Sequence, residues 1–368
     1  MTVRVGLIHY GLDRQTSGIG RYTIELSSAL TDQGVFVHPL WAGACLPGAE
    51  GETLPGAYLL PGLLTFGQAE IAWLARRRRL DVVHDPTGAL PLLLTGAARV
   101  VTIHDAIPYV YPQTSTRLDW LIYHVWLPLA LRRVDAVITD SEQSRKDIIT
   151  YLPVSPERVV PVSLAADRRF RPMETSEVEP ILRTYDVQSP YILYVGALES
   201  RKNLPRLLEA YALLRQWSPQ WRLVIVGARK WKFSPIFDAV QRLGLETHVT
   251  FTGYVEDEHL PALYAGADLF AFPSLYEGFG LPVLEAMACG TPVVTSNASS
   301  LPEVAGDAAI LVDPHNVEQI AQAMWLVLSQ PALAAQLRAK GQARAAQFSW
   351  ERTARETIAV YERVLAGR

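Results

Sequence analysis

The regular alternation of short apolar runs with longer amphipathic segments most constrains the fold of this chain. Runs rich in β-branched residues lie at 3–9, 81–84, 99–105 and 135–141, and again at 191–197, 222–228, 249–253, 268–274 and 292–297. Apolar runs of about 4–8 residues are typical of strands buried on both faces of a parallel sheet. Amphipathic segments such as 203–217 and 317–330 lie between them. The pattern predicts doubly wound α/β layers.

The length of the chain predicts more than one such layered domain. Its 368 residues are many for one hydrophobic core and sufficient for two. Residues 165–180 are polar, contain prolines and lack a strand pattern, and a new series of strands begins at Tyr191. We expect an N-terminal Rossmann-like domain over 1–168 and a second over 169–350. Residues 351–368 are expected to form one more helix.

Composition excludes several classes of protein. An apolar fraction of 49% with 19% charged residues is that of a globular chain, and the net charge of −3 gives no general attraction to nucleic acid. Cys45 and Cys289 stand far apart without other metal-ligating neighbours, so neither a disulfide framework nor a zinc site is expected. No apolar run reaches the roughly 18 residues of a membrane span. Residues 1–11 resemble a strand more than a signal peptide, so a cytoplasmic location is expected.

The segment 276–290, YEGFGLPVLEAMACG, combines two carboxylates with a glycine-rich helix start. Pro282 suits the first turn of a helix and Gly290 its C-terminal end. Backbone N–H groups at such a start can bind an anion. Glu277 before the helix and Glu285 one turn into it could accept hydrogen bonds from hydroxyls on either side of a diphosphate. The alternative is a surface loop with a favourable acidic first turn.

A second cluster of polar residues follows the run that starts at Tyr191. Arg201 and Lys202 precede a helix that Asn203 could cap. Two cations beside a helix start favour a diphosphate, because the helix dipole and the side chains attract the same charge. A solvated basic loop is the alternative interpretation.

The N-terminal half contributes a glycine loop and three histidines at strand ends. Gly18 and Gly20 follow the first strand, but Thr23 stands where a third glycine would complete a dinucleotide-binding motif. His9, His84 and His104 each come at the end of a predicted strand, and the position of His104 in TIHD favours a functional role most. For His9 and His84 a packing role is favoured.

The motifs EGFGLPVLEAMACGTPVV, GALESRKN, FTGYV, SGIGRYT and TIHD together resemble the retaining glycosyltransferases of family 4. They occur in the family's order over nearly the whole chain. The resemblance implies a GT-B fold, with two Rossmann-like domains facing a central cleft and the last helix returning to the first domain. It also implies transfer of a sugar from a nucleotide-diphosphate donor with retention of configuration and without a metal. The chain contains no DxD pair, which agrees with a site where cationic side chains replace the metal.

The resemblance implies a role for each matching residue. Glu285 would hold the ribose and Glu277 the transferred sugar, Arg201 and Lys202 would neutralise the leaving diphosphate, and His104 would contact the sugar near its reacting carbon. These last four, Glu277, Arg201, Lys202 and His104, form the predicted catalytic set. The predicted donor site comprises Gly18, Gly20, Arg201, Lys202, Glu277, Gly278, Phe279, Gly280, Leu281 and Glu285. No role is carried over to Glu199 or Ser200.

Substrates and partners are expected from the same resemblance. SGIGRYT is similar to the loop of bacterial mannosyltransferases of polysaccharide biosynthesis, so GDP-mannose is the expected donor and a glycan or lipid-linked glycan the acceptor. A UDP-sugar transferase, an epimerase and a nucleotide-sugar-binding protein without turnover stay open as alternatives. Arg76 to Arg79 favour a solvated helix end, with contact to the inner face of an anionic membrane as the alternative. The segment 118–133, which includes Trp120, is expected to pack in the core.

Overall fold

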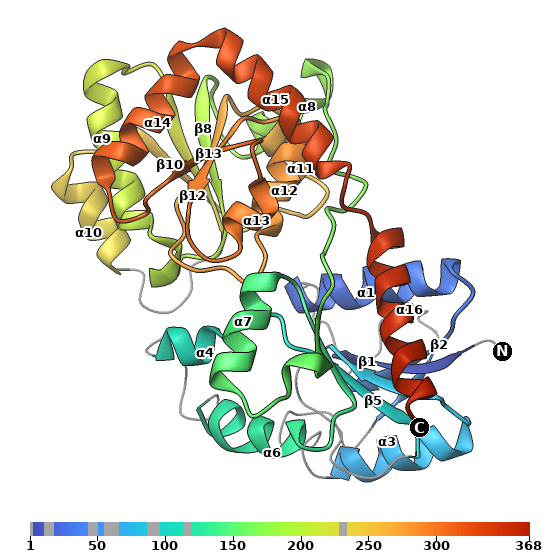
Figure 1. Ribbon diagram of the computed structural model, residues 1–368. Coiled ribbons are helices and arrows are strands. Elements are labelled where there is room, and N and C mark those ends of the chain that lie inside the picture. The colour runs from blue at the N-terminus through green and yellow to red at the C-terminus, as the bar shows by residue number, and fades with distance from the viewer. Residues whose placement is uncertain are drawn as a thin grey trace. The chain divides into compact units, whose positions relative to one another are not determined.

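The chain divides into two compact units in the computed structural model (Figure 1). The structure describes residues 3–10, 18–42, 51–54, 66–86, 96–112, 120–227 and 234–368. Unit 1 comprises Met1–Leu164 together with Ser349–Arg368, and unit 2 comprises Ala165–Phe348. Thr16 and Ser17 of the glycine loop, and Cys45, lie outside the described residues.

Unit 1 is built on a parallel sheet with the strand order β3-β2-β1-β4-β5-β6-β7. Its strands are β1 (Arg4–Tyr10), β2 (Phe36–Ala42), β3 (Glu52–Thr53), β4 (Val82–Asp85), β5 (Ala98–Thr102), β6 (Ala136–Thr139) and β7 (Val159–Pro161). The direction of strand addition reverses between β1 and β4, so this pair forms the topological switch point at which open α/β sheets bind ligands.

Helices connect the strands of unit 1, as the parallel pairing requires. They are α1 (Gly18–Asp32), α3 (Phe66–Arg77), α4 (Ile107–Val110), the π-helical η3 (Ile122–Trp126), α6 (Leu127–Leu131), α7 (Glu142–Tyr151), the 3-10 turn η4 (Pro156–Arg158) and α16 (Trp350–Ala366). Apolar side chains of α3 pack against β1, β2 and β4, and those of α6 and α7 pack against β5 and β6. The C-terminal helix α16 contacts α1, β5 and β6 of the same unit.

Unit 2 repeats the architecture with a parallel sheet of order β10-β9-β8-β11-β12-β13. Its strands are β8 (Tyr191–Val195), β9 (Arg222–Val226), β10 (Val249–Gly253), β11 (Leu269–Phe272), β12 (Val293–Ser296) and β13 (Ile310–Val312). Its helices are α8 (Thr175–Thr184), the 3-10 turn η5 (Ser200–Lys202), α9 (Leu204–Trp217), α10 (Ser234–Arg242), α11 (Leu260–Ala265), α12 (Leu281–Ala288), α13 (Leu301–Ala305), α14 (Val317–Ser329) and α15 (Pro331–Ala345). The switch point lies between β8 and β11.

These two sheets confirm the predicted fold class of doubly wound Rossmann-like layers. Each apolar run named from the sequence overlaps one strand, whereas β2, β3, β7 and β13 were missed. The three-residue strands and the two-residue β3 are too short for a periodic signal, and β2 carries Pro39 and His38 within its apolar run.

The expectation that residues 118–133 pack wholly in the core is wrong. Ile122, Leu127 and Leu131 are buried, but Trp120, Leu121, Val125 and Leu129 are exposed. The π-helical turn η3 changes the phase of the helix, so the apolar side chains do not share one face. In the described part of the chain, no helix is long and apolar enough to cross a bilayer.

Candidate active site

The largest group of predicted site residues meets at the switch point of unit 2. Arg201 and Lys202 lie in η5, directly after β8, and Glu277 lies in the loop after β11. Strands β8 and β11 are neighbours in the sheet, so their carboxyl ends bring these segments together. Leu275 N donates to Arg201 O at 2.8 Å, which joins the two loops through their backbones.

Glu277 is the centre of a buried ionic cluster. Its Oε1 accepts from Lys202 Nζ at 2.6 Å and its Oε2 from Arg201 Nη1 at 2.9 Å. Ser274 Oγ lies 2.6 Å from the same Oε1. Arg201 Nε also donates to Glu199 Oε2 at 3.1 Å. The two cations therefore hold Glu277 in place, and the cluster of two cations and two carboxylates is close to neutral.

The electrostatics of the cluster keep Glu277 ionised. Burial alone would raise the pKa of Glu277, but the charges of Lys202 and Arg201 and the hydrogen bonds it accepts lower the pKa below its usual range. An ionised carboxylate can only accept hydrogen bonds, so Glu277 suits the hydroxyls of a ligand. Neither Glu199 nor Ser274 was assigned a role from the sequence. The position of Ser274 just after a strand at the switch point was the signal that could have identified it.

The loop that carries Glu277 is fixed by two serines between β12 and α13 and by a helix start. Ser299 Oγ lies 2.5 Å from Glu277 O, and Ser300 Oγ lies 2.6 Å from Phe279 O. Gly280 has φ of 120° and is the N-cap of α12. Residues with a Cβ rarely adopt this φ, so glycine is favoured here, and a Cβ would also lie 2.8 Å from Leu301 Cδ2.

Helix α12 starts at Leu281, where the position of Pro282 predicts a helix start. Pro282 lies in the first turn of α12, Cys289 is its C-cap, and Gly290 follows with φ of 76°. The first N–H groups of a helix have no acceptor within the helix. The predicted backbone donors Phe279, Gly280 and Leu281 lie at this helix start, next to Gly278.

Glu285 lies on α12 and is buried. Its Oε2 accepts a hydrogen bond from Tyr264 Oη at 2.9 Å, and both side chains are buried. Tyr264 belongs to α11, so a second helix orients this carboxylate. Tyr264 was not singled out from the sequence, because a tyrosine in an apolar helix gives no signal beyond packing.

Asn203 occupies the predicted N-cap position of α9 but does not cap it with its side chain. It adopts a left-handed conformation, and its Nδ2 donates to Pro273 O at 3.0 Å and to Pro314 O at 2.6 Å. The expectation of a side-chain cap is therefore wrong. Asn203 instead links η5 to the ends of β11 and β13, which fixes the loop with Arg201 and Lys202.

In unit 1, His104 lies just beyond the end of β5 with both ring nitrogens engaged. Nδ1 is 2.8 Å from Asp140 Oδ2 and Nε2 is 3.1 Å from Pro86 O. The rings of Tyr22 and His104 are nearly perpendicular, with centroids 4.8 Å apart. Burial lowers the pKa of His104, but the charge and hydrogen bond of Asp140, with Asp105 and Pro86, outweigh it and raise the pKa above its usual value.

The other predicted residues of unit 1 differ in their environment. Gly18, exposed, and Gly20, buried, open α1 after β1. His9 is buried against Trp41, and burial lowers its pKa to about 4. His84 bridges Tyr361 Oη and Thr102 Oγ1 at 2.7 and 2.8 Å, and burial lowers its pKa to about 3. Both histidines are neutral packing residues, as favoured from the sequence.

Family models match both halves of the chain. Residues 183–344 match Glycosyl transferases group 1, and residues 16–170 match Glycosyltransferase Family 4. This chain belongs to the family 4 glycosyltransferases. The predicted class of enzyme, a hexosyltransferase, is thereby confirmed.

Relatives and solved structures agree with this family. The chain is 34% identical over 367 residues to an O-antigen chain mannosyltransferase B of Escherichia coli, which covers 94% of this chain and 96% of the relative. It is 33% identical over 310 residues to an MMP alpha-(1->4)-mannosyltransferase of Mycolicibacterium hassiacum, covering 79% of this chain and 72% of the relative. Anabaena HepE, solved in complex with UDP and glucose, matches at a TM-score of 0.78 and 20% identity over 96% of this chain and 98% of that one. The GT-B fold is therefore confirmed.

Proposed function

We propose that this glycosyltransferase moves mannose from GDP-mannose to a glycan or lipid-linked glycan, with retention of anomeric configuration. The observation that carries the choice of mannose is the similarity, over nearly the full length of both chains, to an O-antigen chain mannosyltransferase. A UDP-sugar donor is the alternative, because HepE was solved with UDP and glucose on the same fold.

The contacts of the predicted site residues in unit 2 support a role for each of them in this transfer. Glu285 holds the ribose hydroxyls, Glu277 the mannose hydroxyls, and the start of α12 binds the diphosphate. In the transfer, the bond from the anomeric carbon to the diphosphate breaks and a bond to the acceptor oxygen forms. The acceptor proton leaves with the diphosphate. Arg201 and Lys202 stabilise the negative charge that develops on it.

A panel of nucleotide sugars tests the donor directly. A ligand that binds only the folded protein raises its melting temperature by mass action. We expect GDP-mannose to give the largest shift, and transfer assays with mannosylated acceptors to yield a product of unchanged anomeric configuration by NMR. A larger shift with a UDP-sugar would assign the alternative donor, and an inverted product would reject retention.

Metal independence is part of the proposal. It is supported by Arg201 and Lys202 at the switch point, which place charged N–H donors beside the proposed diphosphate site, although Glu277 and Glu199 balance their net charge. Transfer should continue in EDTA at an unchanged rate. Loss of transfer in EDTA with recovery on adding a divalent ion would show that the cations do not suffice.

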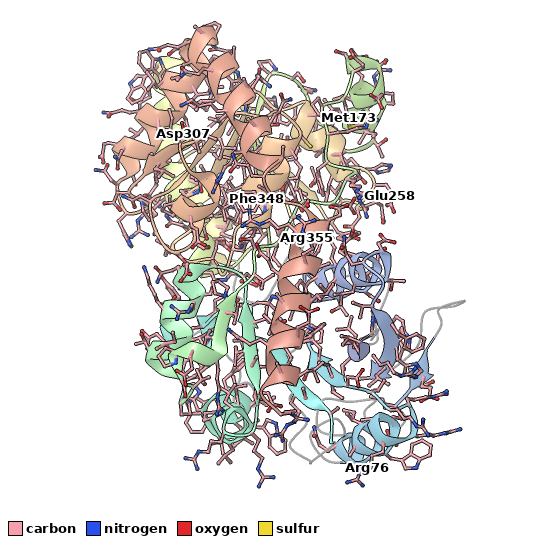
Figure 2. All side chains as sticks on the ribbon, turned by 45° about the vertical axis from the view of Figure 1, so that its right-hand side comes forward. Arg76, Met173, Glu258, Asp307, Phe348 and Arg355 are labelled. Carbon is pink, nitrogen blue, oxygen red and sulfur yellow. The ribbon has the colours of Figure 1, made fainter. Side chains whose placement is uncertain are left out.

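Contact with an anionic membrane is proposed as the place where a lipid-linked acceptor is met. Trp120, Leu121 and Leu129 are each about half exposed, and the exposed Arg132 follows them. In Figures 1 and 2, α3 lies at the same end of unit 1 as α6, with Arg76 on its outer side. Exposed tryptophans and arginines suit the headgroup region.

Vesicle sedimentation tests this contact. We expect binding to vesicles with anionic lipid, weaker binding to purely zwitterionic ones, and a clear loss in Trp120→Ser. Trp217→Ser removes an equally exposed indole from unit 2 and is the matched control. Equal binding by both variants would place the contact elsewhere.

A further inference from the structure

His104 faces a hydrogen-bond acceptor at each ring nitrogen. The Pro86 carbonyl, 3.1 Å from Nε2, can only accept a hydrogen bond, so Nε2 carries a proton. An ionised carboxylate also only accepts, so Nδ1, 2.8 Å from Asp140 Oδ2, carries one too. An imidazole with both nitrogens protonated is a cation.

The proton between His104 Nδ1 and Asp140 Oδ2 belongs to the imidazole ring, because a free Asp carboxyl group has a pKa of about 3.9 and a free imidazole has a pKa of about 6.5. The charged groups that face His104 favour this distribution. Asp140 follows β6 and Asp105 is the next residue in the chain, whereas Tyr22 of α1 and His84 of β4 are both uncharged there.

Asp140 is held in a short, buried segment. It directly precedes Ser141, whose Oγ caps α7 by accepting from Ser144 N at 3.0 Å. Ser144 Oγ in turn donates to His104 O at 3.2 Å. Among the described residues, no hydrogen bond reaches Asp140 Oδ1, although the atom is buried. Burying a carboxylate is costly unless it is paired with an opposite charge and hydrogen-bonded. A positively charged His104 would offset this cost for Asp140.

We propose that Asp140 is a positioning residue that holds His104 in a fixed orientation as a doubly protonated imidazolium. The inference rests on the proposed transferase function and on the role at the donor sugar that the sequence resemblance implies for His104. It adds a statement about mechanism, because an imidazolium has no free nitrogen lone pair. His104 then acts on the sugar through its charge and shape and does not serve as a general base.

NMR titration of isotope-labelled histidine tests the protonation state, with the His104 signal assigned from its absence in His104→Gln. In the wild-type protein the ring should titrate above the value of about 6.5 for free histidine. In Asp140→Asn, loss of the opposite charge should lower the pKa of His104 by about one unit or more. Glu142→Gln removes an equal charge from an exposed side chain two residues away and should leave it unchanged.

Turnover provides a second readout. Above its pKa, the imidazolium fraction falls about tenfold for each unit by which the pKa is lowered, so the alkaline limb of kcat should move to lower pH in Asp140→Asn. An unchanged His104 pKa in Asp140→Asn, or a wild-type pKa at or below that of free histidine, would overturn the inference. The wild-type titration decides the question even if the variant does not fold. Full activity of His104→Gln would reject only the proposed role of His104.

Discussion

At the residue scale, the two glutamates of the 276–290 segment differ in what holds them. Glu277 is bound by two cations and a serine, whereas Glu285 accepts from a neutral tyrosine. Removal of Glu277 takes the carboxylate from the buried Lys202 and leaves Arg201 with Glu199, which strengthens the local positive charge.

These partners predict opposite effects on nucleotide binding. Glu285→Gln should weaken both donor and free nucleoside diphosphate by roughly 1.5–3 kcal/mol, about tenfold to a hundredfold. Glu277→Gln should reduce kcat by a similar factor while free nucleoside diphosphate binds at least as tightly as to the wild type. Calorimetry with GDP and steady-state kinetics measure the two effects, and Glu318→Gln on the exposed side of α14 is the control. Weaker GDP binding in Glu277→Gln would mean that the carboxylates are assigned to the wrong ends of the ligand.

At the same scale, the sequence predicted the residues that share a motif and missed those that meet only through the fold. Glu277, Arg201 and Lys202 were predicted from charge beside helix starts. Their contact could be anticipated only in part, because it depends on β8 and β11 being adjacent in the sheet. Asp140 and Tyr264 reach His104 and Glu285 from distant parts of the chain, so no local pattern marks them.

At the scale of elements, long apolar runs in the sequence predict the strands of the two sheets, whereas very short strands give too weak a pattern to be predicted. The strands named from the sequence include every strand at the two switch points, β1, β4, β8 and β11. Strand β2 is the longest strand that was not predicted from the sequence. It was missed because its first half is only partly buried. The place in the sheet where Arg201, Lys202 and Glu277 meet was therefore predictable, because central strands carry the strongest apolar signal.

The packing of α11 on α12 should control nucleotide affinity through one hydroxyl group. Tyr264→Phe removes the hydrogen bond to Glu285 without changing the ring, and should weaken GDP binding roughly threefold to tenfold, for about 0.5–1.5 kcal/mol. Tyr211→Phe removes a buried hydroxyl from α9 that donates to Trp221 O and His248 O. This control should lose stability without losing affinity. Identical GDP affinities in Tyr264→Phe and the wild type would show that Glu285 needs no support from α11.

At the scale of the whole molecule, unit 1 is assembled from two distant parts of the chain. The chain leaves it at Leu164 and returns at Ser349, so α16 completes unit 1 only after all of unit 2. A buried chain of hydrogen bonds joins α16 to the sheet: Tyr361 Oη to His84, His84 to Thr102, and Thr102 Oγ1 to Tyr22 Oη at 3.0 Å. Thr353 Oγ1 adds a bond to Ser163 O at 2.7 Å.

Tyr361→Phe should therefore destabilise unit 1 selectively. The substitution leaves His84 Nδ1 buried without its partner, which costs roughly 1–3 kcal/mol. Hydrogen exchange should accelerate in α1, β4, β5 and α16, and stay unchanged in unit 2. Tyr191→Phe is the reciprocal control, because Tyr191 Oη donates to Leu263 O at 2.7 Å within unit 2 and its loss should accelerate exchange only there. Equal acceleration in both units by either variant would show that the two units unfold as one cooperative body.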